Sequence, residues 1–302
     1  MQQSAEMTWW IRPGLDVRDG RLRVAGHDAE DLAREHGTPL FVYDLVRVQE
    51  QAVALRDALI GAGLQGIVRL ALKAQRDPAV LAFLRERCPW VGIDACSPGE
   101  VRWSIGLGWA PDEVSYTGTN VSERDLDVIL SAGVHLNVDL LSQLDRVGRR
   151  APGSTVGLRV NPRVGAAYDG GAGTKYAGGR PTKFGILAEQ VPEALAIAAR
   201  HGLTIDTVHV HAGDGYLTDG LPVLEETLRR VAAMVRTLQE AGCPIREVNT
   251  GGGLGVPMRA GDRPLDLAAW ASIVAEHLGP LHVELATEPG DFLVKEDRKS
   301  VV

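Results

Sequence analysis

Two charged side chains stand at the ends of apolar, β-branched runs, where a charge is costly. Lys73 follows the run Gly66–Ala71, and Glu288 follows the run His282–Thr287. A lysine there needs a partner or a lowered pKa, and a lowered pKa makes its amine a nucleophile for Schiff-base formation with an aldehyde cofactor. A carboxylate beside a pyridine nitrogen keeps that nitrogen protonated, so that the ring can stabilise a carbanion. Each residue alone is more often structural, and only the combination points to this chemistry.

Three consecutive glycines, Gly251–Gly253, follow the apolar run Ile245–Thr250, and Gly290 follows Glu288. Glycines let the backbone approach a ligand closely and leave N–H groups to bind an anion. A flexible turn would not need three glycines in a row. The last glycine of a G-x-G-x-x-G motif is replaced by Val256, which argues against a dinucleotide-binding loop. These segments therefore predict a phosphate site.

His211 could serve such a site in two ways. Its ring offers a flat surface for stacking, and an imidazole with an unperturbed pKa can carry a proton near neutral pH. His209 lies two residues earlier, so on a strand both rings would point to one face and could bind a metal ion. No further histidine or carboxylate has ligand spacing, so we predict no metal site.

These residues belong to a regular alternation of short apolar runs and amphipathic segments such as Ala188–His201 and Gly220–Ala241. Near-continuous apolar strands are typical of a parallel sheet covered on both faces. Eight strand–helix units in this length favour an α/β fold of the TIM-barrel type over an open doubly wound sheet. The eight candidate strands are Gly66–Ala71, Trp90–Ala95, Glu113–Thr117, His135–Val138, Thr155–Val160, Ile205–His211, Ile245–Thr250 and His282–Thr287.

In TIM barrels the active site lies at the carboxyl ends of the strands, and phosphate commonly binds after the seventh and eighth strands. Further polar residues of this chain lie at or just after the carboxyl ends of the second, fourth, fifth and sixth predicted strands, namely Asp94, Asp139, Arg159 and Asp214. The glycine-rich segment 165–181 follows the fifth strand. It is either a mobile loop over the barrel mouth or a tolerated insertion.

Composition argues against several classes of protein. The 302 residues are 45% hydrophobic and 24% charged, with a net charge of −7 and no block of Lys or Arg, so nucleic acid is not an expected partner. No apolar run reaches about 18 residues, and no signal-peptide pattern opens the chain, so we expect no membrane span or secretion. Three widely spaced cysteines indicate a reducing, cytoplasmic environment.

Together these residues resemble the fold-type III decarboxylases that use pyridoxal 5'-phosphate (PLP), which include diaminopimelate, ornithine and arginine decarboxylases. The resemblance covers about residues 39–294 and touches all eight strands. It implies an alanine-racemase-like (β/α)8 barrel that decarboxylates an amino acid through a Schiff base on Lys73, usually as a homodimer. The implied catalytic residues are Lys73, His211, which stacks on the ring, and Glu288, which pairs with the pyridine nitrogen. The implied cofactor contacts are Lys73, Asp94, Arg159, His211, Asp214, Gly251, Gly252, Gly253, Glu288, Gly290 and Asp291.

Two positions depart from the family pattern. Asp214 stands where the family usually has serine, and Asp291 stands where it usually has arginine. An anion beside a phosphate is repulsive. Backbone amides alone could hold the phosphate, the aspartates could face a cationic substrate group, or PLP binding could be weak. Weak binding would suit an alternative function, a non-catalytic or regulatory paralogue with the same barrel. Glu288 argues against a racemase, because racemases pair the ring nitrogen with arginine.

The first residues differ from the rest of the chain. Apolar positions alternate on both sides of Asp19-Gly20, which predicts a β-hairpin. We expect residues 1–40 to belong to an otherwise absent β-domain, 41–296 to form the PLP-binding barrel, and 297–302 to be a candidate non-native tail. Those last six residues match one reading frame of a widely used sequencing adapter. The resemblance places catalytic residues in the absent β-domain, so we expect this fragment to bind PLP, to be inactive alone, and to associate through its unpaired strand edges.

Overall fold

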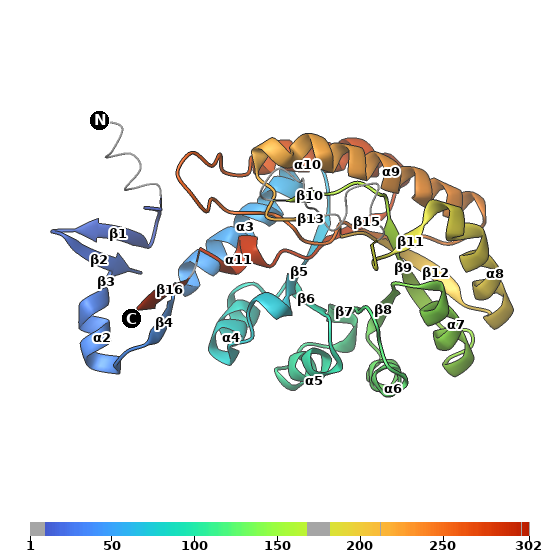
Figure 1. Cartoon of the computed structure of the whole chain (residues 1–302), viewed down its shortest axis with the longest axis horizontal. Coiled ribbons are helices and arrows are strands. Elements are labelled where there is room, and N and C mark those ends of the chain that lie inside the picture. The colour runs from blue at the N-terminus through green and yellow to red at the C-terminus, as the bar shows by residue number, and fades with distance from the viewer. Residues whose placement is uncertain (1–9, 168–181, 212, 297, 302) are drawn as a thin grey trace.

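Eight parallel strands form a closed barrel (Figure 1). The structure is a computed structural model that describes residues 10–167, 182–211, 213–296 and 298–301. The barrel strands are β5 (Gly66–Ala71), β6 (Val91–Ala95), β7 (Val114–Thr117), β8 (His135–Val138), β9 (Thr155–Asn161), β12 (Thr204–His209), β14 (Glu247–Asn249) and β15 (Glu284–Thr287). Pairing of β15 with β5 and of β8 with β9 closes the ring. The predicted TIM barrel is confirmed, and no predicted strand end is wrong by more than two residues.

Helices surround the barrel. They are α3 (Leu45–Gly61), α4 (Pro78–Arg87), α5 (Pro98–Gly106), α6 (Glu123–Ala132), α7 (Leu141–Arg150), α8 (Val191–His201), α9 (Leu221–Glu240), α10 (Leu267–Leu278) and the short α11 (Asp291–Val294). Two of them, α4 and α5, begin shortly after candidate site residues, and capping residues next to each helix fix where it begins. Asp77 and Ser97 accept hydrogen bonds from amides of the first turn of α4 and α5, and a proline follows each of them. These caps keep the connections after β5 and β6 short.

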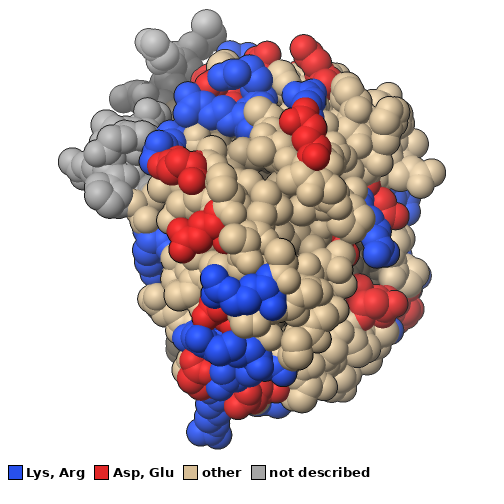
Figure 2. Space-filling model, turned by 90° about the vertical axis from the view of Figure 1, so that its right-hand side faces the viewer, with Lys and Arg blue, Asp and Glu red and all other residues tan. Residues whose placement is uncertain are grey.

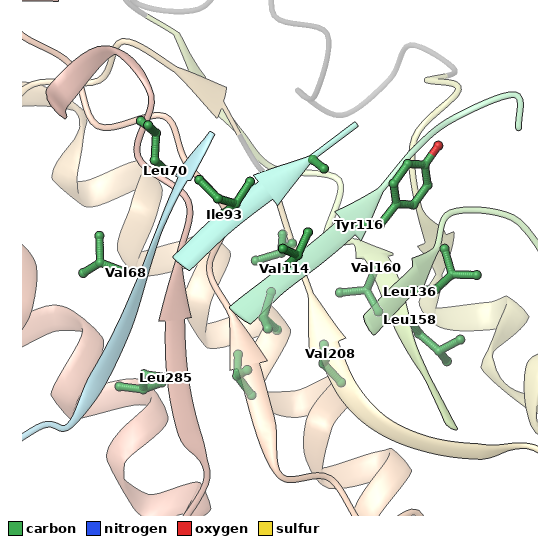
Figure 3. Close-up of a cluster of buried hydrophobic side chains, with 14 of the residues drawn as sticks. Val68, Leu70, Ile93, Val114, Tyr116, Leu136, Leu158, Val160, Val208 and Leu285 are labelled. Carbon is green, nitrogen blue, oxygen red and sulfur yellow. The ribbon is translucent and has the colours of Figure 1, made fainter. Parts of the chain in front are cut away.

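Alternate residues of each barrel strand point to opposite faces, as β-geometry requires. Val68 and Leu70 of β5 are fully buried and belong to the apolar layer between strands and helices (Figure 3). Arg69 lies between them and faces the inside of the barrel. The inside is largely polar, and its buried side chains include Arg69, Asp94, Ser115, Asn137, Thr207, His209, Glu247 and Asn249. It therefore differs from the apolar interior that is common in TIM barrels.

The N-terminal segment lies beside the barrel, at the left of Figure 1. The predicted hairpin is confirmed as β1 (Leu15–Arg18) and β2 (Arg21–Val24), with both turn residues at positive φ. The short strand β3 (His27–Asp28) and helix α2 (Ala29–His36) follow it. Strand β4 (Leu40–Tyr43) then pairs antiparallel with β16 (Arg298–Val301), which lies in the segment that we set apart as a candidate tail. Most of the glycine-rich segment 165–181 lies outside the described residues.

The surface shows no concentration of one charge on the face that Figure 2 presents, where acidic and basic side chains lie side by side. None of the helices in the described ranges has the length and apolar character needed to cross a membrane. The three cysteines, Cys88, Cys96 and Cys243, are all free thiols.

Candidate active site

Lys73 lies in a 3-10 turn, η1 (Leu72–Ala74), directly after β5. Its Nζ atom is 4.0 Å from Oδ2 of Asp94, and the side chain is 53% exposed, so the amine is accessible. The two residues meet because β5 and β6 pair in a register that aligns Ala71 with Asp94. Partial burial acts to lower the pKa of Lys73, but the carboxylates of Asp94 and Glu288 outweigh this effect and raise it. The expected lowered pKa is therefore wrong, because two carboxylates face the amine.

Asp94 is a buried carboxyl with incomplete pairing. It is 4% exposed, and its Oδ1 atom has no hydrogen-bond partner among the described residues. Burial and the nearby Glu288 carboxylate raise the pKa of Asp94, whereas Lys73 acts in the opposite direction. Two buried carboxyls so close together cannot easily both ionise, so the negative charge of Asp94 is unfavourable.

Replacing Asp94 with asparagine should stabilise the chain near neutral pH by roughly 1–3 kcal/mol, because the buried, partly unpaired charge is removed. Since the folded-state pKa of Asp94 is raised, wild-type stability falls as pH rises from the unfolded pKa of about 3.9 through the folded value. The gain should therefore shrink as pH falls toward about 4. Urea unfolding at several pH values measures it.

Asp139→Asn is the matched control for this experiment. Asp139 is fully buried, but it accepts hydrogen bonds from Thr119 Oγ1 at 2.6 Å and from the Gly185 amide at 2.8 Å. The same substitution should destabilise the chain at this satisfied position. An Asp94→Asn variant that is less stable than wild type at neutral pH would contradict our view of Asp94.

Glu288 follows β15 and is 4% exposed. Its Oε2 atom accepts a hydrogen bond from His209 Nε2 at 3.0 Å, and its Oε1 atom accepts one from Asn249 Nδ2 at 2.6 Å. Burial alone would raise the pKa of Glu288, but His209, Arg69 and Lys73 together lower it. Glu288 is thus an ionised carboxylate inside the barrel. We did not predict that Asn249 would bind Glu288. Asn249 lies two residues before Gly251, and this spacing puts it on the same strand face as the site.

His211 has a defined tautomer. Its Nδ1 atom accepts a hydrogen bond from the Gly252 amide at 3.2 Å, so the ring hydrogen is on Nε2. Burial, together with the charges of Lys73 and Arg159, lowers the pKa of His211 to about 3. The ring is therefore neutral at physiological pH. Of the two predicted uses, this environment favours a stacking surface and disfavours a proton carrier.

The glycine run brings three loops into backbone contact. A Cβ atom on Gly251 would lie 2.2 Å from the carbonyl oxygen of Val210, and one on Gly252 would lie 2.3 Å from that of Glu288. A Cβ atom on Gly253 would lie 2.5 Å from the carbonyl oxygen of Gly213. Side chains at these positions would force the loops after β12, β14 and β15 apart. The glycines therefore assemble the edge of the site where we predicted phosphate.

Arg159 places a second cation at the barrel mouth. It is 7% exposed, and its Nη1 atom lies 3.4 Å from Oδ1 of Asp139. Its guanidinium also stacks on Phe184 at 4.5 Å from the ring centroid. Phe184 lies next to Gly185, whose amide binds Asp139, so this cluster connects β9 to the segment before β11 (Ile186–Leu187).

The two unusual aspartates lie in different surroundings. Asp291 opens α11 and is 48% exposed, and its Oδ2 atom is 2.7 Å from Nζ of Lys295, one helical turn away. Lys295 therefore offsets the negative charge of Asp291. Asp214 is exposed and lies in the short strand β13 (Gly213–Asp214), which pairs with β10 (Ala166–Ala167). Both carboxylates are exposed, unlike the buried carboxyls of Asp94 and Glu288.

The residues that the barrel assembles fit a pyridine aldehyde phosphate. Lys73 offers an accessible amine, Glu288 a buried carboxylate, and His211 a neutral ring. The Oδ1 atom of Asp94 is a further buried acceptor, without a hydrogen-bond partner among the described residues. Within the described ranges, no group of three or more His, Cys, Asp or Glu side chains is placed to hold a metal ion. Fold and site together define a barrel of the PLP-binding class.

A family model described as the pyridoxal binding domain of pyridoxal-dependent decarboxylases matches residues 45–295. The chain therefore belongs to this family, which confirms the resemblance seen in the sequence. PLP is the cofactor that this family membership assigns to the barrel.

Individual relatives support the assignment. The chain is 36% identical to the diaminopimelate decarboxylase of Methanothermobacter thermautotrophicus over 292 residues, which are 93% of this chain and 67% of the relative. It is 34% identical to that of Streptomyces coelicolor, over 87% of this chain and 58% of the relative. The chain thus spans about three fifths to two thirds of the length of these relatives.

Solved structures show the same fold. Diaminopimelate decarboxylase from M. jannaschi superposes with a TM-score of 0.83 at 25% identity, over 95% of this chain and 69% of that one. The Helicobacter pylori enzyme complexed with L-lysine gives a TM-score of 0.80 at 24% identity, over 90% of this chain and 68% of that one.

Proposed function

We propose that this barrel serves the PLP-dependent decarboxylation of an amino acid, of the kind that diaminopimelate decarboxylases carry out. The observation that carries the proposal is the placement of an accessible amine and a buried, ionised carboxylate at the same end of one barrel. Lys73 supplies the amine, and Glu288 supplies the carboxylate. The relatives that are 34–36% identical carry this name and support the choice.

In this proposal each residue has a defined task. Lys73 Nζ would bind the aldehyde carbon of the cofactor covalently, and Glu288 would accept a hydrogen bond from the ring nitrogen. His211 would cover a face of the ring as a neutral surface, and the amides of Gly253 and Gly290 would bind the phosphate. The amides of Gly251 and Gly252 already donate to Asn249 Oδ1 and His211 Nδ1, so these two glycines would contribute the close approach of the backbone instead. The cofactor, when bound, supplies an electron sink for the carbanion that remains after CO₂ leaves.

A residue of the chain is placed to accept the proton of the Lys73 amine. The amine has to lose its proton before it can act as a nucleophile. Asp94 Oδ2 lies 4.0 Å away, and the raised pKa of Asp94 suits a carboxylate that accepts this proton and holds it. Arg159 adds a fixed positive charge near the same space, which favours binding of an anionic cofactor or substrate group.

The proposed substrate is a small amino acid, and diaminopimelate is the first choice. L-lysine, which is present in the Helicobacter pylori structure, is what remains when diaminopimelate loses one carboxyl group as CO₂. A homodimer in the cytoplasm is the proposed setting. The exposed carboxylate of Asp214 is available to a cationic group of the substrate, whereas Asp291 already binds Lys295.

A second candidate is a non-catalytic relative in which PLP binds weakly. The observation that favours it is the presence of two carboxylates, Asp214 and Asp291, where the family pattern has a neutral and a basic side chain. The ion pair between Asp291 and Lys295 weakens this objection, because the ammonium group of Lys295 partly offsets the negative charge of Asp291.

Titration of the purified chain with PLP separates the two candidates. We expect a yellow complex with about one PLP per chain, as one Lys73 site requires. Adding diaminopimelate should then change the visible absorption, because the substrate amine displaces Lys73 from the cofactor. L-alanine at the same concentration is the control for amines that lack the second charged end. A chain that stays colourless at saturating PLP would contradict the decarboxylase proposal and favour the non-catalytic candidate.

A further inference from the structure

Two fully buried side chains hold the carboxylate of Glu288 from neighbouring strands. His209 Nε2 lies 3.0 Å from Oε2, and Asn249 Nδ2 lies 2.6 Å from Oε1. His209 is 1% exposed and Asn249 is 0% exposed. Among the residues that the structure describes, each oxygen of Glu288 therefore has one donor. Because a carboxylate oxygen can accept two hydrogen bonds, each oxygen keeps the capacity to accept one more.

The barrel sheet dictates this arrangement. The parallel strands β12 and β14 pair in a register that puts His209 directly beside Asn249, with both side chains inside the barrel. The backbone of Glu288 is also fixed, since its amide donates to the carbonyl oxygen of Gly251 at 2.8 Å. Thr287 Oγ1 donates to the same carbonyl oxygen at 3.0 Å. Glu288 is thus fixed both at its backbone amide and at its two carboxylate oxygens.

His209 keeps an unsatisfied atom at this position. Its Nδ1 is buried and has no hydrogen-bond partner among the described residues. A buried, unpaired nitrogen is unfavourable, so packing alone does not explain a histidine here. Its useful atom is Nε2, which faces Glu288. The titratable groups that interact with Glu288 from the surrounding strands are Arg69, Lys73, Asp94, His209 and His211.

We propose that His209 and Asn249 are positioning residues that keep Glu288 ionised and oriented toward the ring nitrogen of the bound cofactor. The orientation toward the cofactor rests on the proposed function. The hydrogen bonds from His209 and Asn249 to Glu288 are present in the chain itself. The two residues act through Glu288, and neither has to touch the cofactor. A deprotonated, immobile Glu288 is what a protonated pyridine ring requires as its partner.

The first test follows the Glu288 carboxyl itself and needs no cofactor. NMR of chain labelled with ¹³C at the glutamate carboxyl carbons gives the titration, and Glu288→Gln identifies the Glu288 signal. His209→Phe and Asn249→Leu each remove one donor, so the midpoint of Glu288 should rise by about one pH unit or more in each. His209→Gln places an amide near the position of Nε2 and should restore most of the shift.

Asn137→Leu is the matched control, because Asn137 is a fully buried amide inside the same barrel that bonds to Ser115 and Thr117. It should leave the titration of Glu288 unchanged. If one of the donor variants fails to fold, the other carries the test. A Glu288 midpoint that stays at its wild-type value in His209→Phe or in Asn249→Leu, whichever folds, would overturn the proposal.

The second test uses PLP as the probe and records the visible absorption of the bound cofactor against pH. With the His209 donor removed, Glu288 becomes a stronger base and competes with the ring nitrogen for the proton that they share. At a given pH the absorption of the bound cofactor should therefore shift toward that of the unprotonated ring in His209→Phe, while Asn137→Leu behaves as wild type. An unchanged absorption in His209→Phe counts against the positioning role. Wild-type chain that binds no PLP would refute the proposed function, whereas the carboxyl titration would still decide whether His209 and Asn249 hold Glu288.

Discussion

Lys73→Ala is expected to abolish covalent attachment of PLP while leaving the barrel folded. Borohydride reduction of the wild-type chain with PLP, followed by peptide mapping, should place the label on Lys73 and leave the variant unlabelled. The reason is geometric, because Lys73 offers the amine that lies beside Asp94 at the end of β5. Its side chain is 53% exposed and contributes little to the core, so the variant should still fold.

Lys183→Ala is the matched control for this experiment. Lys183 also stands near the barrel mouth, with Nζ 5.1 Å from the ring centroid of Phe184, and its loss should leave the labelling of Lys73 intact. Glu288→Gln should likewise keep the covalent attachment, since it removes stabilisation of the carbanion and leaves the amine in place. Label on another lysine, with undiminished labelling of Lys73→Ala, would remove Lys73 from the proposed mechanism.

Glu247→Ala is expected to lower the free energy of unfolding by about 3–5 kcal/mol, the largest stability effect that we foresee. Glu247 and Arg69 form two hydrogen bonds of 2.7 Å each inside the barrel, and their side chains are 11% and 8% exposed. Removal of the carboxylate leaves the guanidinium buried without its counter-charge. Urea unfolding measures the loss.

Two comparisons make the result specific. The double variant Arg69→Leu with Glu247→Leu should recover most of the lost stability, because an apolar pair of similar volume replaces a buried ion pair at little cost. The pair Arg229–Glu226 also forms two hydrogen bonds, at 2.7 and 2.8 Å, but the Arg229 side chain is 61% exposed. Arg229→Ala should therefore cost much less than Glu247→Ala. If Glu247→Ala and Arg229→Ala lower the free energy of unfolding equally, burial of the Arg69–Glu247 pair does not increase the cost of breaking it.

The fold could be predicted because each barrel strand is a distinct apolar run and because polar residues cluster where the strands end. Lys73, Asp94 and Glu288 converge only when the sheet closes, yet their positions at the carboxyl ends of the first, second and eighth strands were enough to expect them at one end of the barrel. The family-specific roles of individual residues came from motif resemblance, and neither periodicity nor spacing supplied them.

The interior was not predicted, although part of its signal is in the sequence. Arg69 and Asn249 interrupt apolar strands at positions that alternate with buried aliphatic residues, which marks the inner face of a barrel. Which partner each one meets depends on the register between strands, and that is set by closure of the whole sheet. The pKa of Lys73 was misjudged for the same reason, because burial was foreseen but the two carboxylates facing the amine were not.

The glycine run also limits how this protein can change over evolutionary time. At Gly251 and Gly252 a single added methyl group would meet carbonyl oxygens at 2.2 and 2.3 Å, so these positions tolerate no side chain without backbone movement. Point mutation therefore cannot remodel this edge of the barrel by small steps. Adaptation to a ligand with a different anionic group has to come from residues around the run, such as Asp214 and Asp291, whose exposed side chains are under no such steric restriction.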